Sequence, residues 1–329
     1  MRVLAGDIGG TKTAIASVAV GRTSLRLLRV RVYPSAQYAT FEEILEDFLR
    51  AQATARPSAA VFGVAGPVRD GRARVTKLPW VLDERVLAGR LAIRPVRLIN
   101  DFVAAALGLR YVPRRHLATI VPGKEEPGAP VGLIGAGTGL GQAVLIREGT
   151  RERALASEGG HADFGPRDAR EDRLVRFVRK RVERVDRDRL LSGEGLRHIY
   201  DFLRADGFAP ESPAVARAFS SEDRSAVISR HALTGRDRLC AEALRMFVSI
   251  YGSEAGNLAL QYRATGGVYL AGGIAPKILP ALRRREFRDS FRSKPPLNDF
   301  LAAIPVRVVL EPRLPLFGAA AAAYMTPME

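Results

Sequence analysis

The sequence predicts an α/β protein built from two lobes, and three observations lead to this interpretation. The chain has 329 residues, which is enough for two domains with a substantial core each. Apolar, strand-like runs alternate with helical patterns along it. Two glycine-rich segments, 6–10 and 137–141, each join one apolar run directly to another and lie more than a hundred residues apart. We therefore expect a duplicated architecture in which two lobes face each other across a cleft.

The first lobe is expected to begin with three strands and to end in a helix after Asn100-Asp101. Its strands are expected at about 2–8, 13–20, 24–33, 59–65 and 96–99. A helix is expected at about 41–53, where Thr40 and Glu43 have the spacing of a capping box. Arg69-Asp70-Gly71 has the composition of a tight hairpin turn, because Asp-Gly accepts positive φ. An Ala-rich helix begins just after Asn100-Asp101.

The second lobe follows a change of pattern at about 110–112. Proline-containing segments, around Pro113 and between Pro122 and Pro130, are predicted to be linker or loop. Strands are expected at about 131–135, 141–147, 268–271 and 306–310, with mostly helical sequence between about 168 and 262. An Ala-rich helix at 318–324 is expected to return to the first lobe, because the two ends of a lobe often pack together.

Composition and charge narrow the classes of function. Hydrophobic residues make up 47% of the chain and charged residues 26%, as in ordinary globular proteins. The net charge of +16 suggests nucleic-acid binding. However, only 6 of the 51 basic residues are lysine and the basic residues are scattered, which is more typical of a GC-rich genome. We interpret the densest stretches, 170–189 and 283–292, as solvated helical surface and expect no nucleic-acid partner.

Cysteine use and hydropathy exclude further classes. Cys240 is the only cysteine, which excludes an intrachain disulfide and a multi-cysteine zinc site. No apolar run reaches the roughly 18 residues of a membrane span. We also find no leader pattern of basic, apolar and small residues. The sequence therefore predicts no membrane partner and a cytoplasmic location.

The first glycine cluster predicts a phosphate-binding turn. It consists of Gly6, Asp7, Ile8, Gly9, Gly10 and Thr11. Glycines let a ligand approach the backbone closely, and convergent N–H groups beside a carboxylate suit a phosphate with a metal ion. A Walker A motif is excluded because Lys12 follows Thr11 directly and a strand comes next. The cluster at 135–141 fails the dinucleotide fingerprint, because its sixth position is Leu140 and it continues as a strand.

Two polar clusters accompany the glycines. Asn100-Asp101 follows a predicted strand at the edge where α/β sheets bind ligands. Asp101 could instead simply cap the next helix. In Ser157-Glu158-Gly159-Gly160-His161, a Glu/His pair could mark a metal site, but Asp163 is the only acid nearby and no third ligand has useful spacing. Asn, Asp, Glu and His together favour a site that binds the hydroxyls of a polyol or sugar.

Taken in order, these motifs resemble the bacterial ATP-dependent glucokinase family, within the actin-like/sugar kinase superfamily. The resemblance is carried by Gly6-Asp7-Ile8-Gly9-Gly10-Thr11, Asn100-Asp101-Phe102, Gly137-Thr138-Gly139-Leu140-Gly141, Ser157-Glu158-Gly159-Gly160-His161, Leu191-Ser192-Gly193 and Ala271-Gly272-Gly273-Ile274. It covers nearly the whole chain. The Asn-Asp-Phe and Ser-Glu-Gly-Gly-His segments are specific together, whereas the glycine clusters mark only the superfamily. The related ROK sugar kinases typically carry a Cys-rich zinc motif, which a chain with Cys240 alone lacks.

The resemblance implies a fold, an activity and a set of ligands. The fold would be the actin-like ATPase (ribonuclease H-like) two-lobe kinase fold around a cleft. A small α/β domain would span 1–110, joined by the C-terminal helix 311–329, and a larger α+β domain would span 111–310. The activity would be transfer of the γ-phosphoryl group of ATP to the 6-hydroxyl of glucose, with Mg²⁺ and a small-molecule sugar substrate. A homodimer is an assembly that the resemblance allows.

The resemblance also implies roles for individual residues. Asp101 matches the family's catalytic base, and Asn100, Glu158 and His161 match its ligands of sugar hydroxyls. The phosphates would meet Gly6, Asp7, Ile8, Gly9, Gly10, Thr11, Gly137, Thr138 and Gly139, with Gly272 and Gly273 beside the nucleoside and Asp7 near Mg²⁺ through water. Two positions depart from the family pattern. Asp188 stands where a glutamate usually binds the sugar, and Lys12 stands where the family often has Asn.

Other functions stay open at this point. One is a hexose kinase of different or broad sugar specificity. Another is an actin- or Hsp70-like ATPase module, which would leave the segment 157–161 unexplained. A third is a DNA-binding regulator, suggested by the net charge alone. The phosphate hairpins do not identify the phosphoryl donor, so polyphosphate also stays open as an alternative to ATP.

Overall fold

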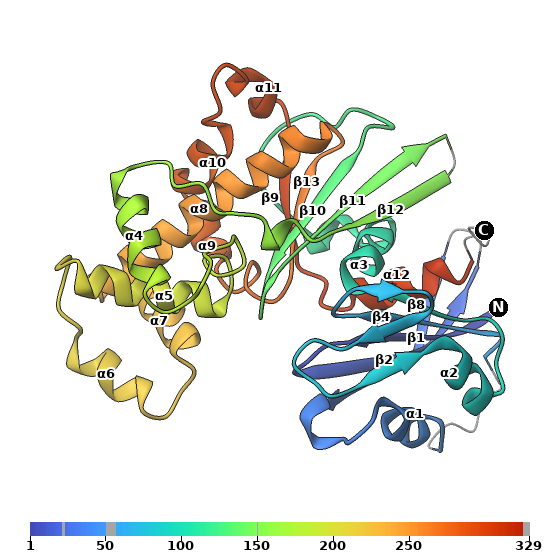
Figure 1. Cartoon of the computed structure of the whole chain (residues 1–329). Coiled ribbons are helices and arrows are strands. Elements are labelled where there is room, and N and C mark those ends of the chain that lie inside the picture. The colour runs from blue at the N-terminus through green and yellow to red at the C-terminus, as the bar shows by residue number, and fades with distance from the viewer. Residues whose placement is uncertain (22–23, 51–56, 150, 325–329) are drawn as a thin grey trace. The chain divides into compact units, whose positions relative to one another are not determined.

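The computed structural model describes residues 1–21, 24–50, 57–149 and 151–324, which form two compact units. The first unit comprises Met1–His116, Arg151–Ala156 and Glu311–Glu329, and the second comprises Leu117–Thr150 and Ser157–Leu310. Both contain a sheet with helices packed on it (Figure 1). The predicted α/β class is therefore confirmed.

The first unit is built on a five-stranded sheet. Its strands are β1 (Arg2–Ile8), β2 (Lys12–Val20), β3 (Leu25–Pro34), β4 (Ala59–Val64) and β8 (Val96–Asn100). Their order is β3-β2-β1-β4-β8. β1, β2 and β3 pair antiparallel, whereas β1, β4 and β8 pair parallel. The carboxyl ends of these three parallel strands therefore lie along one edge of the sheet.

A smaller three-stranded sheet completes the strands of this unit. It consists of β5 (Val68–Arg69), β6 (Arg72–Arg74) and β7 (Val81–Asp83). Asp70 and Gly71 form the turn between β5 and β6 with φ of 52° and 71°. Both central residues thus adopt the left-handed conformation that the Asp-Gly pair predicted.

Helices cover both faces of the large sheet. They are α1 (Phe41–Arg50), α2 (Glu84–Leu91), α3 (Asp101–Gly108) and α12 (Leu314–Ala322), with 3-10 turns at Ser35–Gln37, Leu109–Tyr111 and Arg114–His116. Leu4 of β1 lies in the core formed with α1 and α2, whereas its neighbour Val3 lies in the core formed with α3 and α12. This alternation is the two-residue period of a strand. Figure 1 shows the two helix pairs on opposite sides of the sheet.

Helix α1 begins at Phe41, as predicted, whereas helix α12 begins earlier than predicted. At α1, the N–H of Glu43 donates to Thr40 Oγ1 at 3.4 Å, as in a capping box. The carboxylate of Glu43, however, accepts from the N–H of Ala39. The end predicted for this helix, 51–53, lies outside the described residues. α12 begins at Leu314 rather than at Gly318.

Glycines bring α12 against α3. A Cβ atom at Gly318 would overlap the carbonyl oxygen of Ala104, and one at Gly108 would overlap the carbonyl oxygen of Leu314. The two helix backbones therefore touch, which only glycine permits. Residues 325–329, which the sequence interpretation assigned to the same lobe, lie outside the described residues.

The second unit contributes five strands to a six-stranded sheet with the order β12-β11-β10-β13-β14-β9, whose edge strand β12 belongs, apart from Ser157, to the first unit. The strands of this sheet are β9 (Leu117–Val121), β10 (Val131–Ala136), β11 (Leu140–Glu148), β12 (Arg151–Ser157), β13 (Val268–Ala271) and β14 (Val306–Val309). β10 pairs antiparallel with β11 and parallel with β13, and β13 pairs parallel with β14. The first unit has the same pattern: β1 pairs antiparallel with β2 and parallel with β4, and β4 pairs parallel with β8. The predicted duplication is therefore visible in the topology.

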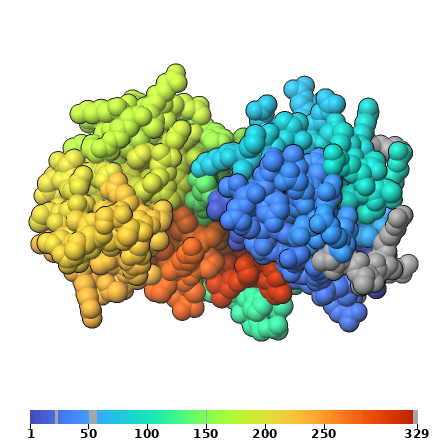
Figure 2. Space-filling model, turned by 90° about the horizontal axis from the view of Figure 1, so that it is seen from below, coloured from blue at the N-terminus to red at the C-terminus, as the bar shows by residue number. Residues whose placement is uncertain are grey.

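The helices of the second unit follow between β12 and β13 and between β13 and β14. They are α4 (Ala169–Arg179), α5 (Gly193–Ala205), α6 (Pro213–Phe219), α7 (Arg224–Thr234), α8 (Arg238–Tyr262), α9 (Leu279–Leu282), α10 (Arg285–Arg292) and α11 (Asn298–Ala302), with a 3-10 turn at Gly159–His161. The yellow segments of Figure 2, which include α6 and α7, form one side of this unit. The long helix α8 packs closely on α10, because Gly252 and Gly256 bring its backbone against Phe287 and Phe291.

Candidate active site

The first glycine cluster forms the tight turn between β1 and β2, as predicted. The N–H of Gly9 closes the turn by donating to the carbonyl of Lys12 at 3.1 Å. The hydroxyl of Ser35 donates to the carbonyl of Gly9 at 2.8 Å and lies 3.0 Å from the hydroxyl of Thr13. Ser35 and Thr13 are fully buried. Two buried hydroxyls therefore support the turn and fix its backbone.

Packing accounts for part of this cluster. A Cβ atom at Gly6 would lie 2.6 Å from Cδ1 of Phe62, and one at Gly10 would lie 2.6 Å from the carbonyl oxygen of Thr76. The side chain of Ile8 is fully buried, so only its backbone can face a ligand. Thr11 is exposed.

Asp7 is the one carboxylate of the turn, and its surroundings are unfavourable for a negative charge. Burial raises its pKa to about 6, against the opposing effect of the nearby Lys12 ammonium. A cation would relieve this penalty. Mg²⁺ is typically held by one or two carboxylates together with waters and substrate phosphates. Asp7 beside a phosphate-sized turn fits that description.

Asn100 and Asp101 lie where β8 ends and α3 begins, as predicted. The alternative that Asp101 is the helix cap is wrong, because the cap is Asn100. Its Oδ1 accepts from the N–H groups of Phe102 and Val103 at 2.9 and 3.2 Å. Its Nδ2 donates to the carbonyl of Gly66 at 3.3 Å. Asp101 is the first helical residue, and its Oδ1 accepts from the N–H of Phe102 at 2.9 Å.

Strand register brings these groups to one edge of the first unit's sheet. Ile8 pairs with Val64 and Val64 pairs with Asn100, so the last residues of β1, β4 and β8 form one row. Asp7 lies one residue earlier along β1, in the row that it forms with Gly63 and Ile99. Neighbouring strands lie about 4.8 Å apart, so the β1 and β8 ends are about 10 Å apart. This spacing can accommodate a phosphoryl group between the Asp7 turn and Asp101.

The second glycine cluster forms the turn between β10 and β11. The N–H of Gly137 donates to the carbonyl of Gly139 at 2.8 Å. Gly272, at the end of β13, has φ of 78°, and a Cβ atom there would lie 2.6 Å from the carbonyl oxygen of Ala136. The structure therefore brings the predicted phosphate turn, which includes Thr138, and the predicted nucleoside turn at Gly272-Gly273 side by side.

The polar segment 157–161 begins at Ser157, the last residue of β12, and ends in a 3-10 turn at Gly159–His161. His161 Nδ1 lies 3.1 Å from Asp186 Oδ2, and 61% of the His161 side chain is exposed. A carboxylate at Nδ1 favours the tautomer that carries its hydrogen on Nδ1, in which Nε2 is an acceptor. The preceding Glu158 is partly exposed. These two side chains can thus offer acceptors to hydroxyl groups.

Asp188 lies between the loop and the second glycine turn. Its Oδ2 accepts from the N–H of Leu140 at 2.5 Å, and its own N–H donates to the carbonyl of Gly160 at 2.8 Å. A Cβ atom at Gly139 would overlap its carboxylate. One carboxylate oxygen of Asp188 is therefore used to join the two segments.

Three residues at this site were not singled out from the sequence. Asp186, Arg187 and Glu254 surround the 157–161 loop. The interpretation of 170–189 as solvated helical surface is wrong at its end, because α4 stops at Arg179 and the Arg187 side chain is only 15% exposed. The spacing of charges in the sequence does not reveal that Arg187 is buried, because its partner, Glu254, lies 67 positions away on α8.

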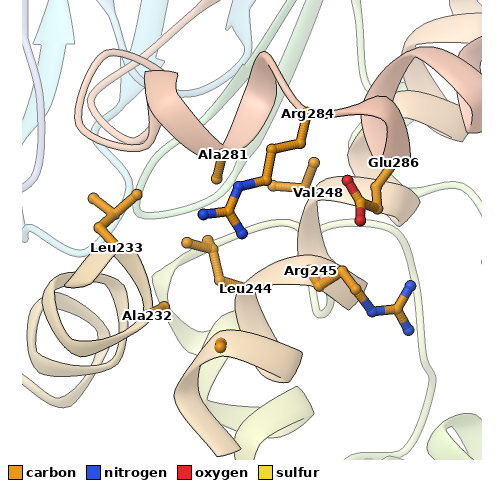
Figure 3. A pocket seen from close by; sticks show the side chains of 9 residues that line it. Ala232, Leu233, Leu244, Arg245, Val248, Ala281, Arg284 and Glu286 are labelled. Carbon is orange, nitrogen blue, oxygen red and sulfur yellow. The ribbon is translucent and has the colours of Figure 1, made fainter. Parts of the chain in front are cut away.

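Two hollows among the described residues contain no predicted site residue, and the larger, of about 350 Å³, lies beside Arg173, Arg176 and Lys180. Figure 3 shows a cavity of about 10 Å³ beside Leu244, Arg245 and Arg284, which has room for about one water molecule and contains no predicted site residue. Within the described ranges, no three His, Cys, Asp or Glu side chains gather to hold a metal ion. No described helix is long and apolar enough to span a membrane.

Known proteins resemble this chain over its whole length. The glucokinase family profile matches residues 4–326. The chain is 41% identical to the glucokinase of Nostoc sp. over 333 residues, covering 97% of each protein. Its structure matches that of a glucokinase from an Antarctic psychrotroph with a TM-score of 0.85, 28% identity and 99% coverage of both chains.

A more distant structure supports the fold. A ROK family glucokinase from Streptomyces griseus, solved in complex with glucose and AMPPNP, matches with a TM-score of 0.67 at 22% identity, covering 99% of this chain and 100% of that one. The neighbours are sugar kinases of the actin-like ATPase type, so the predicted fold is confirmed. The profile match and the full-length relative together show that this chain belongs to the glucokinase family.

Proposed function

We propose that this protein is an ATP-dependent glucokinase that transfers the γ-phosphoryl group of ATP to the 6-hydroxyl of glucose. The observation that carries the proposal is that Asp7, near the carboxyl end of β1, and Asp101, directly after β8, lie at the same edge of the sheet, with only β4 between their strands. One carboxylate lies at a phosphate-sized turn and the other at a helix start. Family membership selects glucose as the acceptor and ATP as the donor.

Asp101 is proposed to act as the general base. It would accept the proton of the 6-hydroxyl while the oxygen attacks the γ-phosphorus and ADP leaves. Asn100 caps α3 and thereby fixes the backbone on which Asp101 stands. Asp7 would hold Mg²⁺ through water, and the ion would neutralise charge on the phosphates. The glycine turns would bind the phosphates through backbone N–H groups.

Glu158 and His161 are proposed to orient the sugar. The His161 ring, held by Asp186, would accept a hydrogen bond from one hydroxyl at Nε2, and the Glu158 carboxylate would accept a hydrogen bond from another. An epimer that leaves one of these groups unpaired would lose about 1–3 kcal/mol of binding free energy.

The proposal assigns the base to the lobe 1–110 with 311–329 and the sugar ligands to the lobe 111–310. We also propose a cytoplasmic location, because ATP is consumed there.

Gly137 and Gly273 provide evidence for nucleotide binding beside the β10–β11 turn and the turn after β13. Among the described residues, nothing lies within 4 Å of a Cβ atom built at Gly273, and the nearest atom to one at Gly137 is 4.0 Å away. Neither has positive φ. Packing and backbone conformation therefore do not require glycine at either position, whereas close approach of a nucleotide would.

Gly273→Ala should raise the KM for ATP severalfold and leave the unfolding temperature unchanged, because its methyl group projects into the space proposed for the nucleoside. The adjacent Gly272→Ala is the matched control. It should destabilise the protein by about 1–3 kcal/mol through its left-handed backbone. Steady-state kinetics and thermal unfolding measure both effects. An unchanged KM for ATP in Gly273→Ala would remove the nucleoside from this turn.

The experiment that tests the proposed function is a sugar panel. Formation of phosphorylated sugar is measured with Mg-ATP over glucose, mannose, fructose, galactose and N-acetylglucosamine. We expect glucose to have the highest kcat/KM. Comparable values for several hexoses would replace this assignment with a broad-specificity hexokinase. ATP hydrolysis with no sugar product would instead identify an ATPase module.

A further inference from the structure

A buried ionic cluster lies beneath the 157–161 loop of the second unit and is not used by the proposed chemistry. Glu254 of α8 is 4% exposed, and its Oε1 accepts from Arg187 at 2.6 Å and from Gln142 Nε2 at 3.2 Å. Its Oε2 accepts from Asn257 Nδ2 at 2.9 Å. A buried carboxylate destabilises a protein unless it is paired and hydrogen-bonded. Arg187, Gln142 and Asn257 together meet that requirement for Glu254.

Arg187 connects this cluster to the loop. Its NH1 group, which donates to Glu254, also lies 3.5 Å from the carbonyl oxygen of Gly159. Its backbone N–H donates to the carbonyl of Ala162 at 3.1 Å. Arg187 therefore contacts the loop on both sides of His161.

The residues on either side of Arg187 hold the same loop. Asp186 contacts His161 Nδ1 at 3.1 Å, and the N–H of Asp188 donates to the carbonyl of Gly160 at 2.8 Å. Three consecutive residues thus determine where the loop lies. Arg187 is anchored to α8 by its ion pair with Glu254, and Asp188 is anchored to β11 by the hydrogen bond from Leu140.

The side chain of Gln142, on β11, packs directly against the backbone of the loop. A Cβ atom at Gly159 would overlap Gln142 Oε1, so the loop backbone rests directly on this side chain. On the opposite side, Lys294 donates to Asn257 Oδ1 at 2.7 Å and so orients the amide that binds Glu254. The loop therefore rests on directional polar contacts, which fix its position more narrowly than apolar packing would.

We propose that the Arg187–Glu254 ion pair positions the 157–161 loop so that Glu158 and His161 meet the sugar hydroxyls. The inference rests on the proposed function for the identity of the sugar. Arg187 and Glu254 are positioning residues, because neither carries a group assigned to the substrate. Their loss should therefore weaken sugar binding and leave ATP binding intact.

The variants Arg187→Lys and Glu254→Gln test this proposal. The lysine keeps the charge but replaces the planar guanidinium, whose donor directions are fixed, with a compact ammonium on a flexible side chain. The glutamine keeps the shape but removes the charge. We expect each variant to raise the KM for glucose roughly tenfold or more, as for loss of a hydrogen bond to a charged group. The KM for ATP should stay within about twofold of the wild-type value.

Arg170→Lys is the matched control. Arg170 of α4 pairs with Glu242 of α8 at 2.5 Å, in the same unit and also largely buried, but away from the loop. Arg170→Lys should leave the KM for glucose and the KM for ATP unchanged. Thermal unfolding of all three variants separates stability from binding, and calorimetric titration with glucose measures the sugar affinity without turnover.

The outcomes distinguish this proposal from the proposed function. If the wild-type protein phosphorylates no sugar, the proposed function has failed. If the wild type phosphorylates glucose and both loop variants keep its KM and affinity, with only a lower unfolding temperature as in the control, the ion pair is structural and the inference is overturned. A selective rise in the KM and dissociation constant for glucose supports it.

Discussion

Asp101→Asn should lower kcat by about 10²–10⁴-fold and leave glucose affinity nearly unchanged. The amide has the same shape as the carboxylate but cannot accept the proton of the 6-hydroxyl. The fold should survive, because the helix cap belongs to Asn100 and not to Asp101. Steady-state kinetics give kcat, and calorimetric titration with glucose gives the affinity.

Asp83→Asn is the matched control for this variant. Asp83 also lies at a strand-to-helix junction of the first unit, where it caps α2. Asparagine is an equally good cap, so kcat should not change, and loss of the exposed ion pair with Arg72 should lower stability only slightly. If Asp101→Asn turned over glucose as fast as Asp83→Asn, Asp101 would not be the base.

Asp7→Asn should abolish activity and, at pH 8, stabilise the protein in the absence of nucleotide. The pKa of Asp7 is about 6 in the folded protein against 3.8 for the unfolded chain. The folded state therefore holds the Asp7 proton more tightly, and stability falls as pH rises from about 4 to 6. A shift of this size corresponds to at most about 3 kcal/mol, and because Asp7 is only partly buried by accessible area we expect about 1–2 kcal/mol.

Denaturant unfolding at two pH values measures this effect. At pH 8 the variant should be more stable than wild type by that amount. Near pH 4 the difference should disappear, because Asp7 is then protonated. Mg-ATP should raise the unfolding temperature of wild type and not that of the variant. Asp70→Asn, at an exposed turn of the same unit, should change neither property. A variant less stable than wild type at pH 8 would make Asp7 a structural residue.

The sequence predicted the elements that carry the glycine turns because long apolar runs flank them. β1, β2, β4, β10 and β13 bury most of their residues, so their hydrophobic patterns are strong. β12 has no fully buried residue and β9 only two, and both lie at sheet edges. Edge strands take their structure from one neighbour, which a local pattern does not reveal.

The sequence could predict those parts of the candidate site that lie within one short motif, but not contacts between residues distant in the chain. Asn100 and Asp101 are adjacent and both suit a helix start, so the choice of cap depends on the backbone of Asn100. Asp186, which orients His161, lies 25 positions away. The ion pair of Arg187 with Glu254 spans 67 positions. No spacing rule connects such pairs, because they are brought together only by the tertiary fold.

The most direct test of the account is the stoichiometry of the wild-type reaction with glucose and Mg-ATP. Phosphorus and carbon NMR would identify the products, with ADP followed in parallel. The account predicts one glucose 6-phosphate for each ADP, and almost no ADP when glucose is left out. ADP released at the same rate with and without glucose, or phosphate found on another hydroxyl, would contradict it.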